Sequence, residues 1–398
     1  MLLTKATSAK NSMYHKKIMI LLTSSVMLVL LSAAAFTYQG QCSDSKELEG
    51  PCSNHSSSLS MNDIQAVGSH NSYKLAIPAP ELDLIRAYRE QSAISLDYTH
   101  LPLTEQLDMG LRQIELDILF DPEGGRYADP LLPRQTASLP EALSYDPSDM
   151  YAPGFKVLHA QDIDVRSTCP TWIKCLIEIR DWSDNNPEHV PILIMLNAKT
   201  GQSAYPDSIA AMDFTEAAFD ALDAETLSVF TRNKIITPDD VRGDANTLRE
   251  AVISDGWPLL EEARGKVFFA LDEGQEKVER YLRGKPSLEG LPMFVNSTNT
   301  EADHAAYFTI NNPVREQQRI QDAVRTGFIV RTRADANTIE ARENNTVRRD
   351  AAFSSGAHYV STDYYVPRLE FSEYTVKLPA RSAARCNPIR RMADCNKR

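Results

Sequence analysis

The chain has 398 residues, of which 42% are hydrophobic and 24% charged, so it can form one large α/β barrel or two smaller domains. Its formal net charge of -12 argues against a nucleic-acid-binding protein, because phosphate binding needs a concentrated basic surface. The same acidity argues against docking on anionic membranes through bulk charge.

The N-terminal segment has the pattern of a targeting sequence. Lys16 and Lys17 precede an apolar stretch that contains three consecutive alanines, which offer a signal-peptidase site. An uncleaved anchor is the alternative, since about 19 helical residues nearly span a bilayer. We therefore assign residues 1–36 to a signal peptide or anchor and the Ser-rich residues 37–60 to a linker. The protein is then secreted or periplasmic, or else membrane-anchored with its remaining residues outside the cytoplasm.

Cysteine usage agrees with an oxidising compartment, because all six cysteines follow the apolar stretch and form three close pairs. A zinc site is the alternative, but no Cys-x-x-Cys pair occurs. The simplest connectivity gives the local disulfides Cys42–Cys52, Cys169–Cys175 and Cys386–Cys395.

Beyond the linker, strand-like and helix-like segments alternate, as a βα array requires. Apolar, β-branched runs predict eight strands, at residues 63–68, 112–119, 155–159, 191–197, 266–271, 293–296, 327–332 and 357–362. A further extended segment, residues 234–237, is assigned to a connection. Apolar spacings of three and four predict helices at residues 171–185, 206–229, 314–326 and 338–353.

Eight such strands predict a TIM-type (β/α)8 barrel. A barrel with irregular connections is the alternative to a regular one. We expect residues 61–366 to form it as a single catalytic domain. Residues 367–398 are basic and irregular and are expected to form a C-terminal tail strapped by a disulfide.

The first four predicted strands each lead to polar residues, and barrel enzymes carry their active sites at the C-terminal ends of the strands. Glu115 and Asp117 are two residues apart on a strand, so both point to one face. Two adjacent inward carboxylates repel unless a cation lies between them, and hard oxygen ligands favour calcium or magnesium over zinc. A solvated sheet face is the alternative for this pair.

Histidines follow two of the predicted strands. His70 and His159 fit a general base and a general acid around a phosphorus centre, while Asn71 can lend its carbonyl oxygen to a hard cation. A hydrogen-bonded structural role is the alternative for either histidine. Asp162 and Asp164 can orient His159 or simply form a turn.

Cationic and acidic residues complete the predicted rim. Lys199, Arg331 and Arg333 suit a phosphate or its developing charge, and a salt bridge to the rim carboxylates fits them equally well. Asp272 and Asp363 also follow strands. No Gly-x-Ser-x-Gly elbow indicates serine chemistry.

As a set, these residues resemble the calcium-dependent phosphatidylinositol-specific phospholipases C of bacterial secreted type. The resemblance covers roughly residues 62–366. It is carried by Gly68-Ser69-His70-Asn71-Ser72-Tyr73, Glu115-Leu116-Asp117, His159-Ala160, Val330-Arg331-Thr332-Arg333-Ala334-Asp335, Gly356 and Ser361-Thr362-Asp363.

The resemblance implies a TIM-type barrel that cleaves phosphatidylinositol by attack of the inositol 2-hydroxyl on phosphorus. The products are diacylglycerol and a cyclic inositol phosphate. His159 is then the acid that protonates the glycerol oxygen, and His70 acts on the phosphate or the attacking hydroxyl. Calcium, in preference to magnesium, is held by Asn71, Glu115 and Asp117.

Asn197 departs from the pattern of these relatives, which usually place a carboxylate at the end of the fourth strand. The amide keeps an oxygen donor for the metal but loses the charge. We expect Lys199, Arg331, Arg333 and Asp272 to bind substrate.

The expected partner is phosphatidylinositol or another phospholipid headgroup at a membrane surface, met by a monomer. The alternatives are another phosphodiesterase on the same barrel, of the glycerophosphodiesterase or sphingomyelinase D kind, and a catalytically impaired protein that binds inositol phosphate.

Overall fold

A computed structural model describes residues 58–254, 256–379 and 382–391. The predicted leader, most of the predicted linker and the pairing of Cys42 with Cys52 lie outside these ranges, as does Cys395. In the part of the chain that is described, no helix has both the length and the apolar character needed to cross a membrane.

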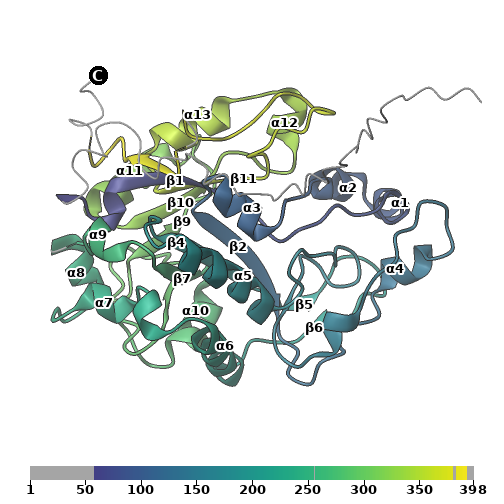
Figure 1. The fold of residues 1–398 in the computed structure, drawn as a ribbon, viewed down its shortest axis with the longest axis horizontal. Helices are drawn as coiled ribbons and strands as arrows, with labels where there is room; N and C mark the ends of the chain where they lie inside the picture. Colours follow the sequence, from purple (N-terminus) through teal and green to yellow (C-terminus); the bar gives the residue numbers. More distant parts are fainter. Residues whose placement is uncertain (1–57, 255, 380–381, 392–398) are drawn as a thin grey trace, which may run out of the picture. The chain divides into compact units, whose positions relative to one another are not determined.

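Eight parallel strands of the described residues form a nearly closed barrel (Figure 1), as predicted from the sequence. Neighbouring strands pair in the order β8, β7, β4, β2, β1, β11, β10 and β9. A parallel bridge between Asn296 and Tyr307 links the two ends of this order. The strands are β1 (Ile64–Ser69), β2 (Gln113–Leu119), β4 (Ile192–Ala198), β7 (Val267–Leu271), β8 (Met293–Val295), β9 (Tyr307–Thr309), β10 (Ile329–Arg333) and β11 (Tyr359–Thr362).

Seven of the eight predicted strands are barrel strands, and one prediction is wrong. Only Lys156–Val157 of the predicted strand 155–159 is extended, as β3, and it pairs antiparallel with the end of β2 outside the barrel order. The eighth barrel strand is β9, which the sequence analysis missed. Residues 234–237 form a connection as predicted, with one bridge from Ile235 to Val267.

Helices connect the strands and cover the barrel (Figure 1). They are α1 (Ala79–Tyr88), α2 (Glu90–Leu96), α3 (Leu103–Asp108), α4 (Leu131–Thr136), α5 (Trp172–Asn185), α6 (Glu216–Val229), α7 (Pro238–Arg242), α8 (Leu248–Ser254), α9 (Leu260–Ala263), α10 (Gln275–Leu282), α11 (Gln317–Thr326), α12 (Ile339–Glu343) and α13 (Val347–Ser354). Helices α5 and α11 confirm two predictions within a few residues.

Two predicted helices differ from the structure. The helix predicted at 206–229 begins only at Glu216, because the residues before it form a two-stranded ribbon of β5 (Gly201–Gln202) and β6 (Ala210–Ala211). The helix predicted at 338–353 is two helices, α12 and α13, because Asn344 has a φ of 51° and ends the first of them. Asparagine tolerates this left-handed backbone better than most residues do.

Strand alternation decides what lies inside the barrel. Ile114, Leu116 and Ile118 of β2 belong to the main hydrophobic core. The intervening Glu115 and Asp117 therefore point to the other, inner face, as predicted. All seven residues of β2 are buried, so both carboxylates lie out of bulk solvent.

The C-terminal tail returns to the barrel. Its strand β12 (Ala384–Cys386) pairs antiparallel with the beginning of β1, from Ile64 to Ala66. The predicted disulfide of Cys386 with Cys395 stays a prediction, because Cys395 is outside the described residues.

Candidate active site

A row of polar side chains crosses three neighbouring strands at their C-terminal ends. Asp117 of β2 is the register partner of Asn197 in β4, and Leu196 is paired with Leu271, which places Asp272 beside Asn197. Asn197 donates its side-chain amide hydrogen to the backbone carbonyl of Asp272. Residues far apart in the chain thus meet at one mouth of the barrel, as the sequence predicts.

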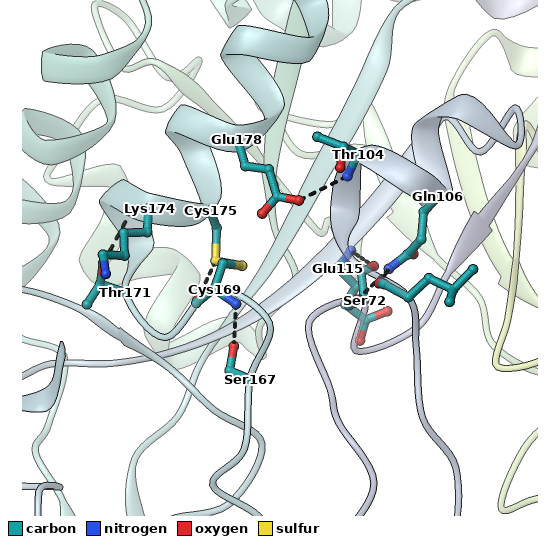
Figure 2. The surroundings of a disulfide bond; sticks show 11 residues. Ser72, Thr104, Gln106, Glu115, Ser167, Cys169, Thr171, Lys174, Cys175 and Glu178 are labelled. Atoms are coloured by element: carbon teal, nitrogen blue, oxygen red, sulfur yellow. Dashed lines mark hydrogen bonds between the residues drawn. A yellow bond between two sulfur atoms is a disulfide. The ribbon is translucent and has the colours of Figure 1, made fainter. Parts of the chain in front are cut away.

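The turn after β1 carries His70 and Asn71 to the same mouth. Asn71 has a φ of 49°, which turns the chain sharply after the strand. Ser72 fixes the turn against β2, because its backbone N–H donates to the Glu115 carbonyl at 2.9 Å and its hydroxyl accepts from the Glu115 N–H at 2.8 Å. Gln106 of α3 donates to the Ser72 carbonyl at 2.6 Å; Figure 2 shows Ser72, Glu115 and Gln106 together.

His70 is enclosed by charged groups. Its Nδ1 lies 2.9 Å from Asp363 Oδ1, Arg333 Nη1 lies 3.1 Å from its Nε2, and the same Nε2 is 3.8 Å from Glu115 Oε1. Burial and the adjacent Arg333 guanidinium lower the pKa of His70 to about 3. The imidazole is therefore neutral near pH 7, with Nδ1 donating to the Asp363 carboxylate and the Nε2 lone pair accepting from Arg333 Nη1.

Asp363 is the buried anchor of this group. Burial opposes its ionisation, but His70 and Arg333 hold the pKa of this carboxyl below its usual range. Arg333 Nη2 donates to Asp363 Oδ2 at 3.1 Å. His100 approaches from a third side, with Nε2 3.8 Å from Asp363 Oδ1 and 2.7 Å from the His70 carbonyl oxygen.

His159 reaches the mouth on a loop, since β3 is not a barrel strand. This loop is paired with the chain that follows His70: Leu75 N–H donates to the Arg166 carbonyl and Thr168 N–H donates to the Tyr73 carbonyl, at 3.1 and 2.8 Å. The Cys169–Cys175 disulfide joins the end of the loop to α5 (Figure 2), and this confirms one predicted pairing.

A buried carboxylate orients His159, which is one of the two roles considered for Asp164 in the sequence. Asp164 Oδ2 lies 2.9 Å from His159 Nδ1 and 3.4 Å from the ammonium of Lys74, which is fully buried. Burial opposes ionisation of Asp164, but Lys74 and His159 lower the pKa of this carboxyl. Asp162 instead accepts from the backbone N–H groups of Leu131 and Ile209, so it organises loops.

Tyrosines connect the two histidine groups. Lys74 lies 4.6 Å above the ring of Tyr98, and Tyr98 Oη accepts a hydrogen bond from Asn71 Nδ2 at 2.7 Å. Tyr73 donates to Asp117 Oδ2 at 3.0 Å, and burial together with the charges of Asp117 and Asp164 raises the pKa of Tyr73. The groups around His70 and His159 therefore belong to one contiguous site.

Two cations already neutralise the inward carboxylates. Arg331 binds Glu115 Oε2 from across the barrel, and its other amino group donates to Asn311 at 2.6 Å. Burial raises the pKa of Glu115 to about 7, although Arg331 opposes this shift. Lys199 Nζ lies 3.0 Å from Asp117 Oδ2. Arg331 and Lys199 therefore form salt bridges with the rim carboxylates, which is one of the two roles predicted for them from the sequence.

The oxygen donors of the site fit a hard cation such as calcium. Asp117 Oδ1 is buried and has no hydrogen-bond partner. Asn71 and Asn197 each use the amide nitrogen for a hydrogen bond, which leaves the carbonyl oxygen as donor. In the described ranges, no three His, Cys, Asp or Glu side chains lie close enough together to hold a metal ion. The candidate calcium ligands are therefore mixed: the carboxylates of Glu115 and Asp117 and the amide oxygens of Asn71 and Asn197.

The sequence analysis did not identify Lys74, Tyr98 or His100 as parts of the site. Tyr98 and His100 lie in the coil between α2 and α3, where no periodic pattern marks them. Lys74 directly follows the His70–Tyr73 segment, and that proximity was the only signal available.

Comparisons with known proteins identify a family and several structures of similar fold. A model of the family described as phosphoinositide phospholipase C, Ca2+-dependent, matches residues 59–388. No curated protein matches the sequence.

Solved structures with a similar fold include a calcium-dependent phosphoinositol-specific phospholipase C from Pseudomonas sp. in complex with myo-inositol. It is 18% identical, with a TM-score of 0.50 over 85% of this chain and 99% of that chain. A Ca2+-dependent phosphatidylinositol-specific phospholipase C from Streptomyces antibioticus is 18% identical, with a TM-score of 0.45 over 77% of this chain and 96% of that chain. A phosphatidylinositol-specific phospholipase C from Listeria monocytogenes is 14% identical, with a TM-score of 0.44 over 79% of this chain and 92% of that chain.

Proposed function

Since the match spans most of its length, the chain belongs to the family of Ca2+-dependent phosphoinositide phospholipases C, and we propose that it cleaves phosphatidylinositol. The inositol 2-hydroxyl attacks phosphorus, so a P–O bond to inositol forms and the P–O bond to glycerol breaks. The products are diacylglycerol and a cyclic inositol phosphate.

His70 serves the attacking side of this reaction. It is neutral, and Asp363 holds Nδ1, so Nε2 can accept the proton of the hydroxyl, or donate to the phosphate once protonated, after Arg333 Nη1 turns from Nε2 to the phosphate. Arg333 brings a positive charge to the same nitrogen, at 3.1 Å, where an anionic phosphate would approach.

His159 serves the leaving side. Its Nδ1 is bound to Asp164, so Nε2 is the nitrogen that delivers a proton to the glycerol oxygen. Asp164 stabilises the imidazolium, and the nearby Lys74 keeps Asp164 ionised. The side chain of His159 is 23% exposed, as a group that meets substrate needs to be.

The residues that would hold calcium are Asn71, Glu115, Asp117 and Asn197. Calcium held by these residues would supply positive charge for the phosphate and would lower the pKa of the attacking hydroxyl. Arg331 keeps Glu115 in place from the opposite wall of the barrel. Asp272 lies beside Asn197, where its carboxylate can accept a hydrogen bond from a hydroxyl of the inositol ring.

One observation carries this proposal: two histidines, each bound through Nδ1 to a buried aspartate, meet inward carboxylates at one barrel mouth. A catalytically impaired inositol-phosphate-binding protein is the competing function, because Asn197 lacks the charge of a carboxylate and Lys199 already pairs with Asp117.

Phosphorus NMR of phosphatidylinositol vesicles with calcium tests the proposal. We expect a cyclic inositol phosphate signal, and a loss of kcat of roughly 10²–10⁴-fold in His159→Ala, the usual range for a positioned proton donor. His304→Gln is the matched control, because His304 lies just before β9 at the N-terminal ends of the strands. Phosphatidate as product, from cleavage of the bond between phosphorus and inositol, or inositol phosphate binding without turnover, would refute it.

We also propose that the protein works outside the cytoplasm, as a monomer that meets its lipid at a membrane surface. The Cys169–Cys175 disulfide supports an oxidising compartment. N-terminal sequencing of the exported protein tests whether the chain is cleaved after the alanines at 33–35.

A further inference from the structure

Lys199 occupies one side of the candidate calcium site. It follows the last residue of β4, and its backbone N–H donates to the Ile118 carbonyl at 2.9 Å, so the side chain starts at the mouth. Its ammonium lies 3.0 Å from Asp117 Oδ2. Asp117 is fully buried, whereas the Lys199 side chain is 35% exposed.

Each inward carboxylate of β2 is already paired with a cation. Arg331 contacts Glu115, and Lys199 contacts Asp117. A divalent cation brought between these carboxylates would meet both positive groups at short range unless one of them moved away. Like charges at such short range repel strongly in a buried setting.

Only one of the two cations is free to move. The Arg331 side chain is 1% exposed and is bound by Glu115, Asn311 and Ser361 at once. Within the described part of the chain Lys199 forms a direct ion pair only with Asp117, while Glu115 and Glu273 act on it at longer range, and it has a flexible stem and access to solvent. Asp117 also keeps a second oxygen, Oδ1, that is buried and has no hydrogen-bond partner among the described residues, so this oxygen remains available to coordinate a metal ion.

We propose that Lys199 is an internal counter-ion that calcium must displace from Asp117, so that this lysine sets the calcium affinity of the site. The inference rests on the proposed function, because it takes Asp117 as a calcium ligand. The amide of Asn197 supports this inference. A carboxylate at that position would add a second negative charge near Lys199 and would hold the lysine more tightly.

Displacement has a further consequence for the substrate. Once released from Asp117, the ammonium of Lys199 remains at the barrel mouth, where the phosphate of the lipid arrives. Calcium binding therefore converts Lys199 from a partner of the carboxylate into a free cation for an anion.

Calorimetric titration of the full chain with calcium chloride alone, without lipid, tests the inference. We expect Lys199→Met to bind calcium about tenfold more tightly than the wild type, the scale of one partly buried charge pair. Lys199→Arg keeps the cation and should bind no more tightly than the wild type. Lys234→Met is the matched surface control, because Lys234 pairs with Asp184 at 2.8 Å and is 33% exposed.

Thermal unfolding in chelator gives a second readout that does not depend on turnover. Lys199→Met should melt below the wild type without calcium, because Asp117 loses its cation, and should gain more from added calcium. Lys199→Gln serves the same purpose if the methionine variant fails to fold.

Unchanged or weaker calcium binding in the neutral variants would overturn the inference. Absence of calcium binding in the wild type would overturn it as well, and phosphatidylinositol cleavage in chelator would then show that the phospholipase function survives without this step.

Discussion

At the scale of single residues, the two histidines owe their orientation to groups that do not touch substrate. His100 is the least obvious of these groups. Its Nε2 donates to the His70 carbonyl oxygen, and its ring stacks on Tyr365 with a centroid distance of 5.5 Å and an angle of 14°. Burial lowers the pKa of His100 to about 4, so the ring is neutral at pH 7 and acts as a fixed hydrogen-bond donor.

His100→Leu should therefore lower kcat about fivefold with little change in KM, the equivalent of one hydrogen bond of about 1 kcal/mol. His100→Gln, which keeps a donor, should recover part of the loss. Steady-state kinetics on phosphatidylinositol vesicles measures both, and the His70 ring-proton resonances in NMR report on its orientation. Equal losses in the two variants would show that His100 only fills space.

The residues at the site differ in how well they can be predicted from the sequence. Glu115 and Asp117 are predictable, because a two-residue period on an apolar strand places both on one face. His100 and Tyr98 are not predictable, because a coil between two helices has no periodicity and their partners are distant in the chain.

At the scale of elements, the close approach of β1 and β2 positions the His70 turn. These strands share one register pair, Gly68 with Gln113, and a Cβ added at Gly68 would lie 2.2 Å from Gln113 Oε1 and 2.7 Å from its carbonyl oxygen. Backbone contacts of this kind cannot be relieved by a side-chain rotation alone.

Gly68→Ala should lower the free energy of unfolding by about 1–3 kcal/mol, the usual cost of overpacking, and should reduce activity by moving His70. Urea denaturation measures the first effect. Gly274→Ala is the control, because a Cβ at Gly274 meets no atom within 4 Å. Equal stability of the two variants would contradict the close-approach account.

The disulfide between the His159 loop and α5 should contribute to stability more than to catalysis. The loop is already held by hydrogen bonds from Leu75 and Thr168, which precede Cys169. The Cys169→Ser, Cys175→Ser double variant should lose about 2 kcal/mol of unfolding free energy, as for a short closed loop, with kcat nearly unchanged. Chemical denaturation and vesicle assays test this, and a large loss of kcat at full stability would contradict it.

Sequence patterns predicted the long strands better than the short ones. The runs that became β4 and β7 are continuous apolar segments, which parallel barrel strands require because they are buried on both faces. β9 has only three residues in a short apolar segment, 305–308, and the apolar Val157 and Leu158 before His159 imitate the end of a barrel strand at β3. In the structure β3 pairs antiparallel with the end of β2, and this pairing depends on tertiary contacts.

At the scale of the whole molecule, buried histidines couple stability to pH. His358 lies far from the mouth, where Nδ1 accepts from the Val330 N–H at 3.0 Å and Nε2 donates to the Asn62 carbonyl at 2.9 Å. Burial lowers its pKa from 6.5 to about 3. Between these values the unfolded chain binds more protons, so this contribution to stability is lost as pH falls below 6.5.

The expected size is about 2 kcal/mol between neutral pH and pH 5 for this one imidazole. Burial raises the pKa of Asp335 to about 7, so this carboxyl shifts stability in the opposite direction on acidification. The contribution of His358 is therefore measured as the difference between the wild type and a His358 variant. Urea unfolding at pH 7.5 and pH 5 should show a smaller loss on acidification in His358→Gln than in the wild type. An identical loss in both proteins would contradict it.

We expect β1, β2, β4 and the His159 loop to act together on one phosphodiester at the mouth of the barrel. A crystal structure with calcium and an inositol phosphate tests it most directly. We expect one calcium ion in contact with Asn71, Glu115, Asp117 and Asn197, and the phosphate between His70 and His159. Calcium bound elsewhere, or a phosphate remote from both histidines, would contradict the account.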